Sequence, residues 1–118
     1  MAYTRERVER ILIGTLLNEY GYDGFMRNGG SVLRAEMFCD KRNAFIFSVI
    51  RRMDGDGAVQ TTPCDVFRYV TEKGIRCGDT GRLCSYMAEV CENYAWSSFR
   101  RYVKMLVDYF LNDKRHGK

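Results

Sequence analysis

Residues 36–67 read EMFCDKRNAFIFSVIRRMDGDGAVQTTPCDVF, and this stretch decides the fold. Asp40 can cap a helix, because its side chain can accept hydrogen bonds from the first free backbone N–H groups. Apolar residues then recur at the spacing of one broad buried stripe: Phe45, Ile46, Val49, Ile50 and Met53. The glycine-rich turn at 54–57 ends this helix, and Thr62 followed by Pro63 marks the start of the next. We therefore expect two helices joined by a short loop.

Upstream of this stretch, the sequence predicts a first helix that Thr4 caps and that ends near Asn18. Its buried stripe follows helical spacing: Val8, Ile11, Leu12, Thr15 and Leu16. Residues 20–30 contain four glycines, so we expect a loop there with at most a short helix at 23–27. A short helical segment at 33–38 should follow.

Downstream, Gly74 is expected to end the second helix of the central stretch. A further helix is predicted over about 81–91, and the longest helix runs from 96 or 97 to about 112. The connection between them is short, which is typical of an antiparallel helical hairpin. The predicted fold is therefore all-α: one domain over 1–118, with a compact helical body at about 4–75 and a long C-terminal hairpin at about 81–112.

The longest helix carries more apolar surface than one core stripe requires. A first row consists of Phe99, Val103, Leu106 and Phe110. A second row consists of Tyr102, Met105 and Tyr109. A helix that is apolar on two sides must bury both, either inside its own domain or against another chain. We favour the second option and predict an oligomer interface at Tyr102, Met105 and Tyr109; the alternative is a central core helix.

Composition indicates a globular protein with 46% hydrophobic and 29% charged residues. No apolar run is long enough for a membrane span, and the start lacks a secretory signal pattern, so we expect a cytoplasmic location. The net charge of +4 arises entirely in 97–118, which holds six basic and two acidic residues. Basic residues late in a helix are favoured by its negative end. Contact with nucleic acid phosphates or with an acidic partner is the alternative explanation.

Residue patterns argue against catalysis. The phosphate-binding Gly-Lys-Ser/Thr pattern is missing, and His116 is the sole histidine, so neither nucleotide hydrolysis nor a catalytic triad is expected. The five cysteines form no Cys-x-x-Cys pair, which makes reduced, non-zinc cysteines the expectation. Acid pairs such as Glu6 with Glu9 are interpreted as solvated charge. We predict no catalytic residue, no metal and no cofactor for this chain.

Four segments form a pattern that extends to both sides of the central stretch. The opening helix RERVERILIGTLL at 5–17 has an apolar run around a glycine and ends in Leu-Leu. Met37-Phe38 precedes a helix that carries Ile46-Phe47, and a Thr-capped helix follows. The run LCSYMAEV at 83–90, followed by Glu92-Asn93, completes the pattern. Together, over roughly 5–112, these segments resemble the amino-terminal domain of DnaB-type replicative DNA helicases.

This resemblance implies a non-catalytic assembly domain whose hairpins pair between subunits, as a homodimer or as a hexameric collar of three dimers. ATP and magnesium would belong only to a separate motor domain. The collar of the family receives primase and, in some systems, a helicase loader, while DNA contact is weak or indirect and no membrane is involved. The partner surface implied here comprises Glu92, Trp96, Arg100, Arg101 and Lys104.

Other functions remain open at this stage. The helicase-binding domain of DnaG-type primase is built along similar lines. A small basic nucleic-acid-binding module would work through Arg100, Arg101 and Lys104 of the last helix, because aromatic and arginine side chains serve both nucleic acid and protein contacts. A small enzyme is the least favoured alternative.

Overall fold

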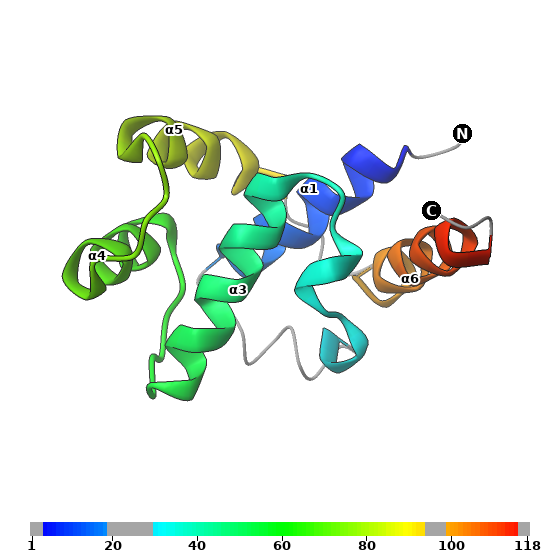
Figure 1. Cartoon of the computed structure of the whole chain (residues 1–118), viewed down its shortest axis with the longest axis horizontal. Helices are drawn as coiled ribbons and strands as arrows, with labels where there is room; N and C mark the ends of the chain where they lie inside the picture. The colour runs from blue at the N-terminus through cyan, green and yellow to red at the C-terminus, as the bar shows by residue number, and fades with distance from the viewer. Residues whose placement is uncertain (1–3, 19–29, 94–98, 116–118) are drawn as a thin grey trace.

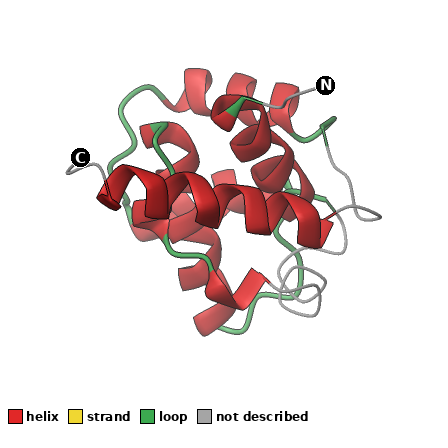
Figure 2. Ribbon diagram, turned by 90° about the vertical axis from the view of Figure 1, so that its right-hand side faces the viewer, coloured by secondary structure: helices red, strands yellow, loops and turns green. Residues whose placement is uncertain are grey.

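The computed structural model describes residues 4–18, 30–93 and 99–115 (Figure 1). Within these residues all regular structure is helical and no strand occurs (Figure 2). The elements in chain order are α1 (Arg5–Leu16), the 3₁₀ turns η1 (Gly30–Val32) and η2 (Ala35–Met37), α3 (Lys41–Gly55), α4 (Pro63–Lys73), α5 (Thr80–Val90) and α6 (Phe99–Arg115). The predicted all-α fold is thus confirmed. The radius of gyration is 13.7 Å, close to the roughly 13.5 Å expected for a compact chain of this length.

The first two long helices, α1 and α3, begin at the residues that the sequence predicted as their caps. The Thr4 hydroxyl accepts a hydrogen bond from the Arg7 backbone N–H at 3.1 Å at the start of α1. The Asp40 carboxylate accepts one from the Arg42 backbone N–H at 2.9 Å at the start of α3. Each cap satisfies an N–H group that has no partner within its own helix. The starts of these two helices could therefore be predicted from their cap residues alone.

Helix α4 has defined signals at both ends. Pro63 occupies its first turn, and the Asp65 carboxylate accepts hydrogen bonds from the backbone N–H and the hydroxyl of Thr62, at 3.1 and 2.6 Å. At the other end Gly74 adopts φ +63°, the left-handed conformation that a glycine takes without steric cost. The predicted start and end of this helix are confirmed.

Helix α1 is the centre of the packing. It lies against α3, α5 and α6, while α4 packs on α3 and α5, and η2 fits between α3 and α6. In Figure 1, α4 and α5 accordingly lie at the left and α6 at the right, with α1 between them. The fully buried side chains of α1 include Leu12, Ile13 and Leu16. Each contributes about 1.5–3 kcal/mol to stability through its removal from water.

Gly14 of α1 lies close to the backbone of α5. A Cβ atom added at this position would lie 2.3 Å from the carbonyl oxygen of Val90 at the end of α5. No real side chain tolerates such a separation from a backbone atom, so the two helices can meet here only because residue 14 has no side chain. The glycine inside the opening apolar run is therefore a packing requirement.

The predicted hairpin is confirmed only in its two helices. Helices α5 and α6 match the expected segments, but each packs on α1, and no extensive packing of one along the other occurs between the described residues. Residues 94–98, which contain part of the expected connection, lie outside the described part. The same holds for the glycine-rich loop, except Gly30, which begins η1. The short helical segment expected at 33–38 corresponds to η2.

Candidate interaction surface

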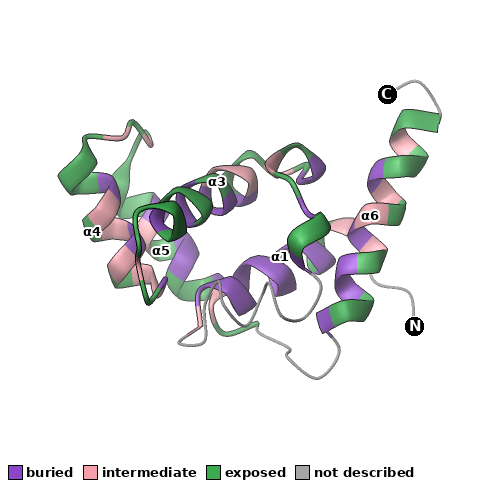
Figure 3. Cartoon of the chain, turned by 90° about the horizontal axis from the view of Figure 1, so that it is seen from below, coloured by how far each residue is buried: buried purple, intermediate pink, exposed green. Residues whose placement is uncertain are grey.

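Helix α6 carries the residues that the sequence predicts as an oligomer interface. One stripe of the helix is buried against α1 and η2: Phe99, Tyr102, Val103, Leu106 and Phe110. These residues are three and four apart, which places them on one side of the helix. Figure 3 shows this buried side of α6 next to α1 and exposed residues on its far side.

The predicted second row is divided between the core and the surface. Tyr102 is 8% exposed and belongs to the buried stripe. Met105 and Tyr109 are half-buried and pack against the core, so they form a flank beside the stripe. Their spacing of four residues places them next to each other on the helix. The apolar surface that remains for a second chain is thus smaller than the sequence suggested, and its role in self-association stays a prediction.

Arg5 at the start of α1 fixes this flank. Its guanidinium carbon lies 6.0 Å from the centre of the Tyr109 ring, within the range of a cation–π contact. The same guanidinium forms an ion pair with Asp113 of α6 and donates a hydrogen bond to the Met37 carbonyl oxygen at 2.8 Å. One residue of α1 therefore connects α6 with η2, and Tyr109 is partly covered within its own chain.

The residues of the expected partner surface come from different elements. Arg100, Arg101 and Lys104 are exposed on α6, and Glu92 is exposed directly after the end of α5. Trp96 lies outside the described residues. Leu111 is 50% exposed, two turns after Lys104, and therefore shares the outer side of α6. The outer side of α6 is thus basic with one apolar side chain, whereas Glu92 belongs to the separate α5 end.

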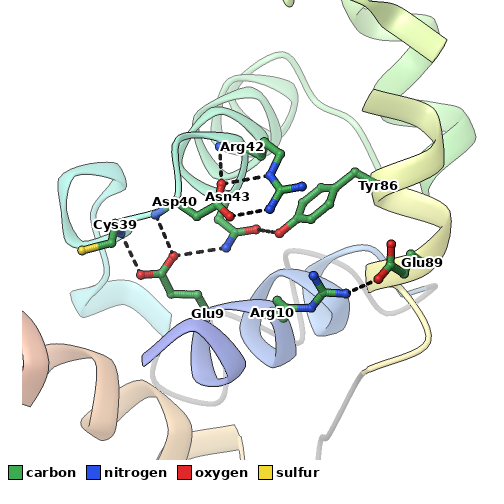
Figure 4. A network of polar contacts seen from close by, with 8 residues as sticks. All are labelled: Glu9, Arg10, Cys39, Asp40, Arg42, Asn43, Tyr86 and Glu89. Carbon is green, nitrogen blue, oxygen red and sulfur yellow. Dashed lines mark hydrogen bonds and ion pairs between the residues drawn. The ribbon is translucent and has the colours of Figure 1, made fainter. Parts of the chain in front are cut away.

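A buried polar network joins α1, α3 and α5 (Figure 4). The Glu9 carboxylate is 1% exposed and accepts hydrogen bonds from the backbone N–H groups of Cys39 and Asp40, at 2.7 and 3.2 Å. It also accepts one from the Asn43 side-chain amide at 3.1 Å, and the Asn43 oxygen accepts one from the Tyr86 hydroxyl. Both oxygens of the buried carboxylate thus accept hydrogen bonds, as burial of a charge requires.

The solvent-facing end of this network is charged. The Arg42 guanidinium donates hydrogen bonds to the Asp40 carboxylate at 3.1 and 2.7 Å, and its carbon lies 3.9 Å from the centre of the Tyr86 ring (Figure 4). The hydrogen bond from Arg42 lowers the pKa of Asp40 below its usual value. Burial, with the nearby Asp40 charge as a smaller cause, raises the pKa of Tyr86 to about 12. Tyr86 therefore keeps its proton at neutral pH.

The interpretation of Glu6 with Glu9 as solvated charge is wrong for Glu9. Glu6 is exposed, but Glu9 is buried because it points toward the start of α3, where backbone N–H groups need an acceptor. Helical spacing gave a signal that the sequence analysis missed, since Glu9 lies three and seven residues before the buried Leu12 and Leu16. A charge on the apolar stripe of a helix indicates a buried partner.

The cysteines contribute no disulfide. All five are free. Cys84 on α5 and Cys91 directly after its end are half-buried. Cys91 packs against the core, and its burial raises the pKa of its thiol.

Comparison with known proteins adds no further assignment. The chain matches no protein-family model and no curated protein. Among the described helices, none is both long and apolar enough to cross a membrane.

Proposed function

We propose that this chain is a non-catalytic assembly domain of a DnaB-type replicative DNA helicase, which associates with further copies of itself and recruits primase. The observation that carries the proposal is the order of the helices. Helix α1, the junction of η2 with α3, the capped α4 and helix α5 occupy the segments on which the resemblance rests. Their boundaries agree with the cap residues that define those segments, including Thr62 and Gly74.

Self-association in this proposal uses the flank formed by Met105 and Tyr109. Both side chains are half-buried in the single chain, so a second copy could cover their remaining apolar surface. Tyr102 supports the flank from within the core. Helices α5 and α6 would be the arms of the hairpin expected over 81–112, and the hairpins of neighbouring chains would pair. The domain would act in the cytoplasm, and any ATP hydrolysis would belong to a separate motor domain.

Light scattering on the purified chain over a wide concentration range tests the proposal. We expect the mean mass to rise from that of a monomer to that of a dimer as the concentration increases. Replacement of both Met105 and Tyr109 by Asp should keep the chain monomeric, because two carboxylates would have to be removed from water at the interface. Circular dichroism checks that the variant still folds. A natural chain that stays monomeric at every concentration would contradict the dimer.

A matched control is available on the same helix. Leu111 is 50% exposed and lies on the outer side of α6, away from the flank of Met105 and Tyr109. Leu111→Asp should therefore leave the association unchanged. Equal loss of association in Leu111→Asp would show that the contact is not specific to the predicted flank.

Primase recruitment is assigned to the exposed residues Glu92, Arg100, Arg101 and Lys104. Trp96 belongs to the same predicted surface. Titration of a DnaG-type primase into the labelled chain, with and without charge reversal at Arg101 and Lys104, measures this contact. A loader would be tested in the same way.

A small basic nucleic-acid-binding module is the second candidate, favoured by the exposure of Arg100, Arg101 and Lys104 on one helix. Neutralised phosphates release counterions, so binding through these residues would weaken steeply as salt increases. An oligonucleotide that binds the monomeric chain tightly, and is released by salt or by loss of these residues, would favour this function over assembly.

A further inference from the structure

A groove of about 600 Å³ lies between the amino-terminal parts of α3 and α5. Its size falls within the range of about 300–1,000 Å³ that is usual for ligand sites. Three cationic side chains and three large apolar or aromatic ones line most of it: Lys41, Arg42, Arg82, Phe45, Leu83 and Tyr86. None of these residues belongs to the predicted interface on α6, so the groove is a separate surface.

The floor of the groove is apolar and already in place. Leu83 and Tyr86 are buried, and Phe45 is half-buried beside them. The Arg42 guanidinium stacks on the Tyr86 ring and is held there by its two hydrogen bonds to Asp40 (Figure 4). Side chains that are fixed before binding lose little conformational freedom when a ligand arrives. The floor can therefore receive a flat or bulky apolar group at low entropic cost.

The rim of the groove carries positive charge that the chain itself neutralises only in part. Lys41 is exposed, and no ion pair to it occurs within the described segments. Arg82 lies 3.8 Å from Asp79, but both side chains are largely exposed, so this pair is weak. The Asp79 carboxylate also accepts hydrogen bonds from backbone N–H groups at the start of α5. Lys41 and Arg82 thus remain available to an acidic ligand.

We infer that this groove binds an acidic peptide segment of a partner protein, with an aromatic or large aliphatic side chain on the floor and carboxylates beside Lys41 and Arg82. Charge complementarity identifies the class of partner, since the rim is cationic and the floor apolar. A peptide can place an uncharged residue beside Asp79 on the rim, whereas a continuous phosphate backbone carries a negative charge at every step and would be repelled there. The inference does not depend on the proposed helicase assignment.

Fluorescence anisotropy with short labelled peptides tests the inference on the full chain. The first peptide contains several Asp residues around a single central Phe, the second has Ala in place of Phe, and the third has Lys in place of Asp. We expect saturable binding of the first, binding weaker by roughly tenfold for the second because one aromatic contact is lost, and none for the third. Absence of saturable binding of the first peptide would overturn the inference, and so would equal binding of the second.

Variants of the chain show where the peptide binds. Lys41→Glu combined with Arg82→Glu changes only exposed side chains and should weaken binding roughly tenfold, because two charge contacts become repulsive. The control, Arg101→Glu combined with Lys104→Glu, changes the same charge on α6 and should leave the affinity unchanged. If both variants weakened peptide binding equally, the peptide would be attracted by charge without a specific site, and the proposed binding in the groove would be wrong. If a single-stranded oligonucleotide bound more tightly than the peptide, and its binding depended on Lys41 and Arg82, the ligand of the groove would be nucleic acid and not a peptide.

Discussion

At the scale of single residues, Glu9 joins two helices although it was expected to be a solvated acid. A carboxylate that is 1% exposed would destabilise the fold if it lacked partners. Here it accepts hydrogen bonds from two backbone N–H groups that precede α3 and from Asn43, and Arg5 lies 3.4 Å away. Glu9 therefore supplies from α1 an acceptor that the start of α3 needs, and so fixes the position of α3 on α1.

Glu9→Gln should lower the free energy of unfolding by about 2–4 kcal/mol. The substitution keeps the size of the side chain, but it replaces one acceptor oxygen with an amide group that faces other donors. Urea denaturation measures the change. Glu6→Gln is the matched control, because Glu6 is exposed on the same helix, and it should change stability by less than about 0.5 kcal/mol. Similar values for the two variants would show that the buried network does not stabilise the fold.

The sequence could show that Glu9 belongs to a buried helical side, but not which groups would meet it. Its partners Cys39, Asp40 and Asn43 lie at least 30 residues further along the chain. Such pairing is decided by how α1 and α3 pack, and helical spacing carries no information about that arrangement. The groove between α3 and α5 escaped the sequence analysis for the same reason, since Lys41 and Arg82 come from different helices.

At the scale of helices, the boundaries were predictable wherever a local signal sets them. Thr4, Asp40, Pro63 and Gly74 each act within one turn of the helix that they begin or end, so the sequence contains the whole interaction. The division of α6 into buried and exposed sides was only partly predictable. Tyr102 was assigned to a second row, yet it is buried together with the first row on a helix that contacts both α1 and η2.

Gly14→Ala should lower stability by about 1–3 kcal/mol or more, although alanine favours a helix more than glycine does. The added methyl group would lie 2.3 Å from the Val90 carbonyl oxygen, so α1 and α5 would have to move apart. Thermal or urea denaturation measures the loss.

The control for Gly14→Ala is Gly55→Ala at the end of α3. No atom lies within 4 Å of the corresponding Cβ position, and Gly55 does not have positive φ. We expect this variant to be unchanged or slightly more stable. Equal stability of Gly14→Ala and the natural chain would mean that the two helices separate without cost.

At the scale of the whole molecule, the sequence predicted the fold class but not the arrangement of its last two helices. Apolar periodicity shows that a helix must be covered, and it does not show which element covers it. Helix α1 covers both α5 and α6 in the described structure, which the short connection between them could not reveal. Because α1 contacts three other helices, a change in one of these contacts affects the stability of the entire chain.

The pH dependence of unfolding tests this coupling through Tyr86. An unfolded tyrosine has a pKa of about 10, whereas burial raises the pKa of Tyr86 to about 12 in the folded chain. Between these values the unfolded chain releases a proton that the folded chain retains, so the free energy of unfolding falls as pH rises through this window. Below about pH 10 Tyr86 is protonated in both states and this loss is absent.

Tyr86→Phe should be less stable than the natural chain at pH 8 by about 1 kcal/mol, because the hydrogen bond to Asn43 is lost. It should lose less stability than the natural chain when the pH is raised to about 11, since it has no proton to release at this position. Chemical denaturation at both pH values, followed by circular dichroism, measures the difference. Parallel loss of stability in the two proteins would mean that Tyr86 titrates in the folded chain as it does in the unfolded one, and that the contacts of α1, α3 and α5 around it do not hold its proton.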